Sequence, residues 1–441
     1  MKSFLICFFL LFFVVLSSAQ KLWTLQACLD RAKTANITIR QKQIAAEQAK
    51  ISVANATCQW LPSLSASASQ NYDLGISPTA TGSYTQNNAC ITTFSASFSL
   101  PLFDGFLIQN NIKAAKLDLK AGIADRNQAQ LEAVTNVIAG YLQILLDKEL
   151  VKAAKDQVSL SEQQYRRTWL MIHAGELSKS ELYEGTAQIA KDSASLVKTE
   201  SDLRLALVDL AQQLQLKSIS GFDIDSSDIN SMPSYTLLSS SNIDSLYQLA
   251  LQHYPAVQAA QYRINKGKSG IAIARSGYFP TINLDAGYSN GYYYYYNLPQ
   301  GVSNSSFINQ FHQNQQEMIS LNLHIPIFDH FDVSHKIKTA KFDLQQQLLT
   351  LEDEKQQLFK TLQQIYYRAI ADKAKYGSLQ KERSALQVAY QYTLKKFEVG
   401  KATAFEVNEK QTALSQAISE QLEARYDYLF SCLTINFYLG R

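Results

Sequence analysis

Residues 94–105 read FSASFSLPLFDG, and residues 319–330 read ISLNLHIPIFDH. In the first stretch, apolar residues and serines alternate from Phe94 to Leu100, which is typical of a strand with one apolar and one polar face. In both stretches a proline and a Phe-Asp pair end the alternation, and a long helical pattern follows. The chain therefore contains the same strand-to-helix signal twice.

The repetition extends over almost the whole chain. A constant separation relates three pairs of residues: Pro101 and Pro326, Tyr165 and Tyr390, and Gly175 and Gly400. Two copies of roughly 220 residues are too long to be solenoid units, so we interpret them as an internal duplication of one half. The predicted repeats span 20–216 and 245–441, and a serine-rich linker at 217–244 joins them.

The N-terminus predicts export. Residues 1–19 contain one lysine, an apolar run and a small-residue end at Ala19, which is the pattern of a secretory signal peptide. No later stretch approaches the roughly 18 apolar residues that a membrane helix needs. If the mature chain contacts a membrane, we therefore expect it to do so as a β-barrel or at the surface.

Charge and motif content exclude several classes of function. The formal net charge is +3, which gives no reason to expect a nucleic acid as a partner. The cysteines are scattered without a Cys-x-x-Cys pair, and the histidines show no metal-ligand spacing. No P-loop, GxSxG or dinucleotide motif occurs, so we expect no enzyme, no catalytic residues and neither a cofactor nor a metal site.

Four strands are expected, in hairpins at 63–100 and 281–325. The strand patterns cover 63–73, 92–100, 281–288 and 318–325, and loops rich in turn-forming residues connect each pair. Serine-rich faces suit a barrel wall with water inside and lipid outside, but they also suit a soluble sandwich. The tyrosine run at 292–296 falls where the third strand enters its loop, either as an aromatic girdle or as a surface loop.

The rest of each copy predicts helix. The stretches 106–172 and 331–398 lack proline and carry heptad-like apolar spacing, so each is expected to form a helix of about 100 Å. The chain turns at 173–178 and 398–403 and returns as shorter helices, which completes helical hairpins over 106–216 and 331–439. Further helices are expected before the β-hairpins, at 36–59 and 254–278.

Four strands are too few for a closed membrane barrel, whose smallest bacterial form has eight strands. A chain whose strands span a membrane must therefore oligomerise, and three copies would supply twelve strands with a matching ring of long helices. A secreted coiled-coil structural or adhesive protein is the alternative, although a fibre needs no matched pair of β-hairpins.

Over roughly residues 22–441 the chain resembles the TolC-type outer-membrane efflux proteins. The specific motifs are the junctions SLPLFDG and HIPIFDH and the helical turns HAGELSKSELYEGTAQ and EVGKATAFEVNEKQTALSQ. The resemblance implies an α+β membrane protein with two internal repeats. It also implies a homotrimer, in which a 12-stranded β-barrel with four strands per chain continues into a long α-helical coiled-coil barrel.

The same resemblance implies a role and partners. Such proteins are exit ducts in the outer membrane, with the helical part in the periplasm, and they serve tripartite efflux or type I secretion systems. The expected partners are two further copies of the chain, a periplasmic adaptor protein, an inner-membrane pump and outer-membrane lipid. The cargo is either small molecules or polypeptides, and no residue decides between them.

Two carboxylates are candidates for a pore constriction. Glu406 and Glu409 are three residues apart and share a helix face. The resemblance implies that they line the periplasmic entrance, where three copies would form an acidic ring that attracts cations. The alternative is a solvated helix face.

The resemblance also implies a gate and a docking region around the two helical turns. Glu181 falls where the family uses an acidic residue to hold the tip closed. Its usual partners are replaced by Phe397 and Ala402, and Lys401 is the expected substitute. The adaptor is expected to contact the turns, at Gly175, Glu176, Leu177, Val399, Gly400 and Lys401. The glycines suit tight turns because glycine tolerates positive φ.

Overall fold

The computed structural model describes residues 22–78, 82–86, 88–226 and 242–439. The predicted signal peptide at 1–19 and much of the predicted linker at 217–244 lie outside these ranges. The chain divides into two compact units. The sheet unit comprises Ala45–Gly122 and Ala259–Leu351, and the helical unit comprises the remaining described residues.

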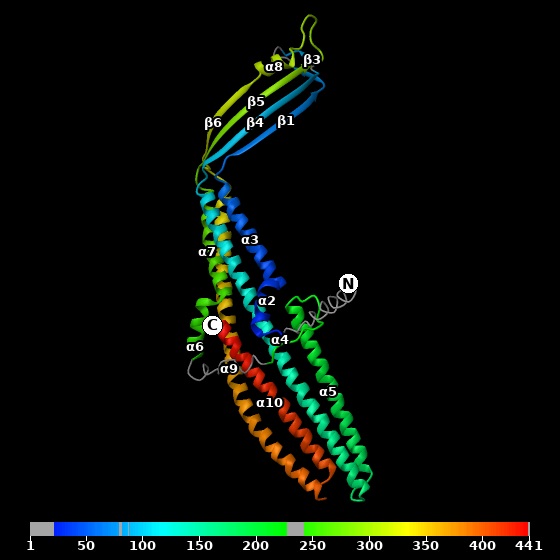
Figure 1. Ribbon diagram of the computed structural model, residues 1–441. Helices are drawn as coiled ribbons and strands as arrows, with labels where there is room; N and C mark the ends of the chain where they lie inside the picture. The colour runs from blue at the N-terminus through cyan, green and yellow to red at the C-terminus, as the bar shows by residue number, and fades with distance from the viewer. Residues whose placement is uncertain (1–21, 79–81, 87, 227–241, 440–441) are drawn as a thin grey trace, which may run out of the picture. The chain divides into compact units, whose positions relative to one another are not determined.

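The sheet unit contains a four-stranded antiparallel sheet in the order β1-β4-β5-β6 (Figure 1). Its strands are β1 (Ser63–Asp73), β4 (Ala89–Phe103), β5 (Thr281–Tyr295) and β6 (Gln316–His324). Serines of β1 lie opposite serines of β4, and two of these pairs join their hydroxyls at 2.7 Å. The polar face that the alternation predicts is thus a ladder of hydroxyl groups.

The third strand is longer than the sequence indicated. The alternation predicted a strand over 281–288, whereas β5 continues to Tyr295 and contains four of the five tyrosines of the run. This extension pairs with the start of β4, from Ala89 to Thr92. The predicted loops also contain three short elements: β2 (Ile76–Pro78), β3 (Tyr84–Gln86) and α8 (Phe307–Gln313).

Side-chain amides complete the free edge of the β5 extension. β6 pairs with β5 only as far as Ser289, so the backbone groups beyond that residue need other partners. Three carboxamides from the loop that contains α8 bind alternate residues of β5, as a neighbouring strand would. The pairs of this amide ladder are Asn314 with Gly291 (2.7 Å), Gln310 with Tyr293 (2.9 Å) and Asn304 with Tyr295 (2.8 and 2.9 Å).

After each β-hairpin, the chain continues with an aspartate and then with two residues in the left-handed backbone region. The carboxylates of Asp104 and Asp329 accept the backbone N–H groups four residues further along the chain. Each aspartate therefore caps the start of a long helix. The φ angles between cap and helix are 66° at Gly105, 69° at Phe106, 55° at His330 and 65° at Phe331.

Four helices contribute residues to both units: α3 (Ile37–Cys58), α4 (Leu107–His173), α7 (Pro255–Ser276) and α9 (Asp332–Glu398). The two long helices, α4 and α9, have 67 residues each, which corresponds to about 100 Å of helix. In the sheet unit α7 packs closely on α9, because a Cβ atom at Gly267 would lie 3.2 Å from Leu344.

In the helical unit, α4 and α5 (Ser180–Gln213) form one hairpin, and α9 and α10 (Ala404–Tyr438) form another (Figure 1). The long and returning helices match the predicted hairpins closely. Two 11-residue helices that the sequence analysis did not predict, α2 (Leu25–Ala35) and α6 (Ile243–His253), precede α3 and α7.

The core of the helical unit lies along α4. The predicted apolar seam is buried at Ile138, Tyr141 and Leu145, where it packs with Leu210 of α5. Among the described residues, α4 is also the one helix with an 18-residue window apolar enough, by length and composition, to cross a membrane. This differs from the prediction that no such stretch exists; half of the window is buried in the protein, as in a core helix.

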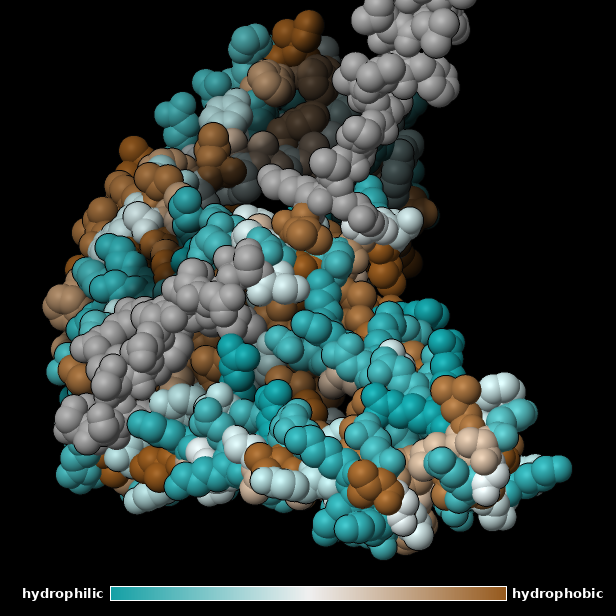
Figure 2. All heavy atoms as spheres, turned by 60° about the horizontal axis from the view of Figure 1, so that its bottom comes forward, coloured by the Kyte–Doolittle hydropathy of each residue, from teal (hydrophilic) through white to brown (hydrophobic). Residues whose placement is uncertain are grey.

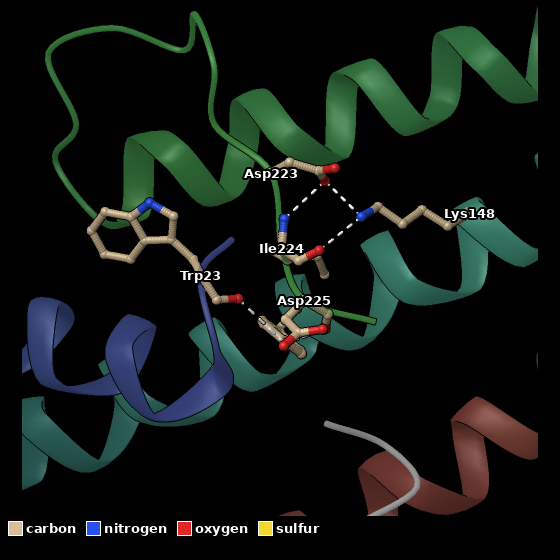
Figure 3. Close-up of polar contacts among 6 residues, drawn as sticks. Trp23, Lys148, Asp223, Ile224 and Asp225 are labelled. Atoms are coloured by element: carbon tan, nitrogen blue, oxygen red, sulfur yellow. Dashed lines mark hydrogen bonds and ion pairs between the residues drawn. The ribbon is translucent and has the colours of Figure 1, made fainter. Parts of the chain in front are cut away.

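A short segment at 223–225 is fastened to the helical unit (Figure 3). Trp23 forms a parallel β-bridge with Ile224. The Trp23 N–H donates to the Asp223 carbonyl at 3.0 Å, and the Trp23 carbonyl accepts the Asp225 N–H at 3.0 Å. The Lys148 ammonium on α4 lies 2.6 Å from the Asp223 carboxylate and donates to the Ile224 carbonyl at 2.8 Å. Trp23 and the segment at 223–225 are therefore held together beside α4.

Candidate functional site

The candidate site lies at the start of α10, and Thr403 fixes that start. Its hydroxyl accepts the backbone N–H of Glu406 at 3.3 Å, which is the N-cap arrangement expected for the sequence TAFE. Val407 and Gln411 form the buried face of the first turns. Glu406 and Glu409 lie together on the exposed face.

The two candidate carboxylates differ in their surroundings. Glu406 lies in the first turn of α10, where the helix dipole favours a negative charge. Glu409 has a cationic partner, because the Lys410 Nζ lies 2.9 Å from Glu409 Oε1. The side chains of this ion pair are 39% and 57% exposed for lysine and glutamate, respectively.

Apolar packing holds the end of α9. Phe397 is 1% exposed, and Ala402 packs against the same cluster of buried side chains. Leu160 and Met171 reach this cluster from α4. Phe397 and Ala402, which cannot form the polar lock expected at their positions, therefore contribute apolar contact instead. We call this the tip cluster; its buried members are Tyr390, Phe397, Ala404, Val407 and Leu414.

Glu181 contacts the start of α10. Its carboxylate accepts a hydrogen bond from the Ala404 backbone N–H, while its Oε2 atom is buried and has no hydrogen-bond partner within the described ranges. Burial raises the pKa of Glu181, the nearby Glu184 carboxylate raises it further, and the bond from Ala404 lowers it in part. The partner of Glu181 is thus the backbone of α10, whereas Lys401 is exposed.

An ion pair that the sequence analysis missed joins the two hairpins. Arg167 near the end of α4 donates to the Glu398 carboxylate at the end of α9, at 3.0 Å. Both side chains are about half exposed, at 47% and 50%. The two residues are 231 positions apart in the chain, and no local pattern relates them. Their pairing depends on how the hairpins pack.

A buried hydrogen-bonded chain, also missed, connects three helices. Gln411 of α10 donates to the Ser161 hydroxyl of α4 at 2.8 Å, and Ser161 donates to the Asp192 carboxylate of α5. Gln157 and Gln188 also donate to Asp192, at 3.3 and 3.0 Å. Asp192 is 8% exposed, so these bonds replace the water that a buried carboxylate loses. We call this chain the polar relay.

The long helices end in the same type of turn. Gly175 and Gly400 have φ of 81° and 70°, which confirms that both positions need positive φ. In each turn the glycine N–H bonds to the carbonyl three residues back, and the next N–H bonds five residues back, as in a Schellman motif. The longer bonds join Glu176 to Met171 at 2.9 Å and Lys401 to Lys396 at 2.8 Å.

The surface at the ends of the two hairpins is mostly hydrophilic, with apolar side chains scattered over it (Figure 2). Of the residues implied for docking, Glu176 is exposed, Leu177 is half-buried and Val399 is 67% exposed. Phe405, next to the candidate carboxylates, is 64% exposed. The turns can therefore offer both polar and apolar contacts to another protein.

Comparison with known proteins identifies the class of the chain. A model of the outer membrane efflux protein family matches residues 28–214 and 246–441. The chain therefore belongs to the outer membrane efflux protein family. It is an outer-membrane channel protein of the efflux and type I secretion class, and its family is one of channels rather than enzymes.

Two relatives and one solved structure illustrate the likeness. The alkaline protease secretion protein AprF of Pseudomonas aeruginosa is 19% identical over 78% of this chain and 68% of AprF. The proteases secretion protein PrtF of Dickeya chrysanthemi is 21% identical over 72% of this chain and 65% of PrtF. The chain thus spans about two thirds of each relative. The CusC channel structure superposes with a TM-score of 0.80 at 18% identity, covering 94% of this chain and 91% of CusC.

Proposed function

We propose that three copies of the chain assemble into an exit duct across the outer membrane. In this assembly the three four-stranded sheets form a 12-stranded β-barrel, and the long helices form an α-helical coiled-coil barrel in the periplasm. Each of the two repeats would contribute one β-hairpin and one helical hairpin per protomer.

The observation that carries this proposal is the pair of open sheet edges. β1 and β6 are the edge strands, and nearly all of their side chains are exposed. Leu64 on β1 is 79% exposed, and Ile319 on β6 is 81% exposed. Long exposed strand edges tend to pair with further strands, and closure into a barrel removes them. Pairing of β1 with the β6 of the next copy would close the ring.

The duct is proposed to receive its cargo from an inner-membrane pump through a periplasmic adaptor protein. The adaptor would contact the turns at 175–177 and 399–401. AprF and PrtF are named for protease secretion, which supports a polypeptide as cargo. The family is named for efflux, which supports small molecules as the second candidate.

Glu406 and Glu409 are proposed to line the periplasmic constriction of this duct. Their exposure on one face of α10 supports this placement. The resting tip is proposed to be held closed by the tip cluster, by the contact of Glu181 with α10 and by the Arg167–Glu398 ion pair. Opening would then separate the two hairpins of one protomer.

Cysteine crosslinking in the outer membrane tests the edge pairing. In a Cys58→Ser background, we combine Ser67→Cys on β1 with Ser320→Cys or Asn322→Cys on β6. Oxidation should yield covalent dimers and trimers, because each β1 would meet the β6 of another copy. Ser67→Cys alone is the control. If oxidation gave monomers alone with both β6 variants, the result would contradict the proposed barrel.

Planar-bilayer recording of the purified protein tests the constriction. A salt gradient should give a reversal potential that reports cation preference, and Glu406→Ala with Glu409→Ala should reduce that preference. An unchanged reversal potential in the double variant would remove both residues from the constriction. If inserted wild-type protein gave no conductance at all, the proposed closed tip would be fully sealed, and a duct that conducts at rest would be excluded.

A further inference from the structure

Three charged residues at the start of α10 form one group. Successive helical residues are about 100° apart around the axis. Glu406 therefore lies between Glu409 and Lys410 when the helix is viewed along its axis. Val407 and Gln411 are 0% and 1% exposed and fix the rotation of the helix. The two carboxylates consequently point away from the core, and Lys410 lies at their flank.

Lys410 can reach both carboxylates. It contacts Glu409 Oε1 at 2.9 Å. It also follows Glu406 by four residues, and a glutamate four residues before a lysine is the favoured order for an ion pair on a helix. One ammonium group is thus paired with Glu409 and lies within helical reach of Glu406.

We infer that Lys410 is a built-in counter-ion of the constriction, which leaves the entrance with half the net charge that its carboxylates would give alone. The inference rests on the proposed placement of Glu406 and Glu409. Each protomer would contribute two carboxylates and one ammonium group. Three copies then carry a net charge of about −3 instead of −6.

This counter-ion determines which solutes the entrance admits. Multivalent cations bind best where several unpaired carboxylates converge. Lys410 occupies an oxygen of Glu409 and adds a positive charge at the same level of the helix. The wild-type entrance is therefore weakly cation-selective and resists block by multivalent cations. Such an entrance also admits acidic cargo, which a fully acidic ring would repel.

The test is Lys410→Gln in planar bilayers, with two measurements. The reversal potential in a salt gradient should show a cation-to-anion permeability ratio about two- to threefold above wild type, because nearby charges in water act over roughly one Debye length. The concentration of hexamminecobalt(III) that halves the conductance should fall about tenfold. Lys410→Arg should restore both values.

Controls separate this inference from folding and from the proposed function. An exposed ion pair adds little to stability, so Lys410→Gln should yield normal trimers, which size-exclusion chromatography checks. Lys381→Gln removes the same charge from an exposed site on α9 and should leave both measurements unchanged.

The outcomes are distinct. If Lys410→Gln behaves as wild type while Glu406→Ala with Glu409→Ala reduces cation preference, the counter-ion inference is wrong and the proposed constriction stands. If neither variant changes selectivity, the placement of α10 in the constriction is wrong as well. An equal shift in Lys381→Gln would show a general charge effect and would overturn the inference.

Discussion

The returning helices α5 and α10 start with similar sequences, SKSE at 178–181 and TAFE at 403–406, yet the two starts differ. Thr403 caps α10 with its side chain, whereas α5 begins without a side-chain cap at Lys179. Glu181 is partly buried against α10, whereas Glu406 is exposed. The motif therefore indicates where a helix starts, whereas contacts with the neighbouring hairpin determine whether its glutamate is buried or exposed.

The largest difference in stability is expected at the ends of α4 and α9, just before the two returning helices begin. Phe397 and Ile172 occupy matching positions of the predicted repeats, but Phe397 is 1% exposed and Ile172 is half-buried. Phe397→Ala should reduce the local stability of the tip by about 3–5 kcal/mol, and Ile172→Ala by about 1 kcal/mol. Hydrogen exchange measures the difference, at the α9–α10 turn for Phe397→Ala and at the α4–α5 turn for Ile172→Ala. Equal effects would show that both tips pack alike.

The polar relay should give the next largest effect. Asp192 matches the buried Ala417 at the corresponding position of the second predicted repeat, so only α5 supplies the carboxylate of such a relay. Asp192→Ala leaves the donors from Ser161 and two glutamines without their acceptor, at a cost of about 1–3 kcal/mol. Hydrogen exchange along α5 checks this, and Asp156→Ala on the exposed face of α4 is the control. Slower exchange in Asp192→Ala would contradict the relay.

Removal of the residues at the two helix starts should change stability by less than the loss of Asp192. Thr403→Ala removes a side-chain cap and should destabilise the first turn of α10 by about 1 kcal/mol. Ser178→Ala should destabilise the start of α5 by less, about 0.5 kcal/mol, because Lys179 makes no side-chain cap and the Ser178 hydroxyl accepts one backbone N–H, that of Ser180, at 3.3 Å. Exchange rates of the first-turn amides compare the two. A larger effect at Ser178 would reverse the comparison.

The smallest effect concerns pH at Glu181. Its pKa is raised in the packed tip, so the packed tip binds a proton more readily than an open tip with a solvated carboxyl. Acidification through the raised pKa towards the ordinary value of 4.5 should therefore stabilise the packed tip, and a rise in pH should remove this gain. Hydrogen exchange of the tip at several pH values measures it.

Two variants sharpen the pH comparison. Glu181→Gln should abolish this part of the pH dependence, because it removes the titrating group while keeping its shape. Glu406→Gln at the matching position should preserve it, because Glu406 is exposed. If Glu181→Gln keeps the wild-type pH profile, another group titrates and Glu181 does not sense protons at the tip.

Local periodicity predicted the long elements well. β1 forms over Ser63–Asp73 as the alternation indicated, and α9 ends at Glu398 as the following glycine indicated. The helices α2 and α6 were not predicted, because each is only 11 residues long and a single residue separates it from the next helix. The extension of β5 to Tyr295 was not predicted, because side-chain amides from a distant loop, rather than β6, complete its edge.

The candidate site could be predicted only in part. The three-residue spacing of Glu406 and Glu409 sufficed to place both on one face of α10. The Arg167–Glu398 ion pair and the relay from Gln411 to Asp192 could not be predicted, since periodicity tells which face of a helix is apolar but not which helix packs against it. The role of Glu181 stays a prediction, but its partner on α10 is now defined.

The amide ladder has a practical consequence for surface display. Its three carboxamides come from residues 304–314, so the chain between Tyr296 and Asn304 supplies none of its bonds. Gly301 lies in this stretch with φ of 89° and open space around it. A foreign peptide inserted after Gly301 would leave β5 and its amides in register, whereas one inserted after Phe311 would separate Asn314 from the other two carboxamides. The loop thus offers a defined position at which an epitope could be carried on the protein.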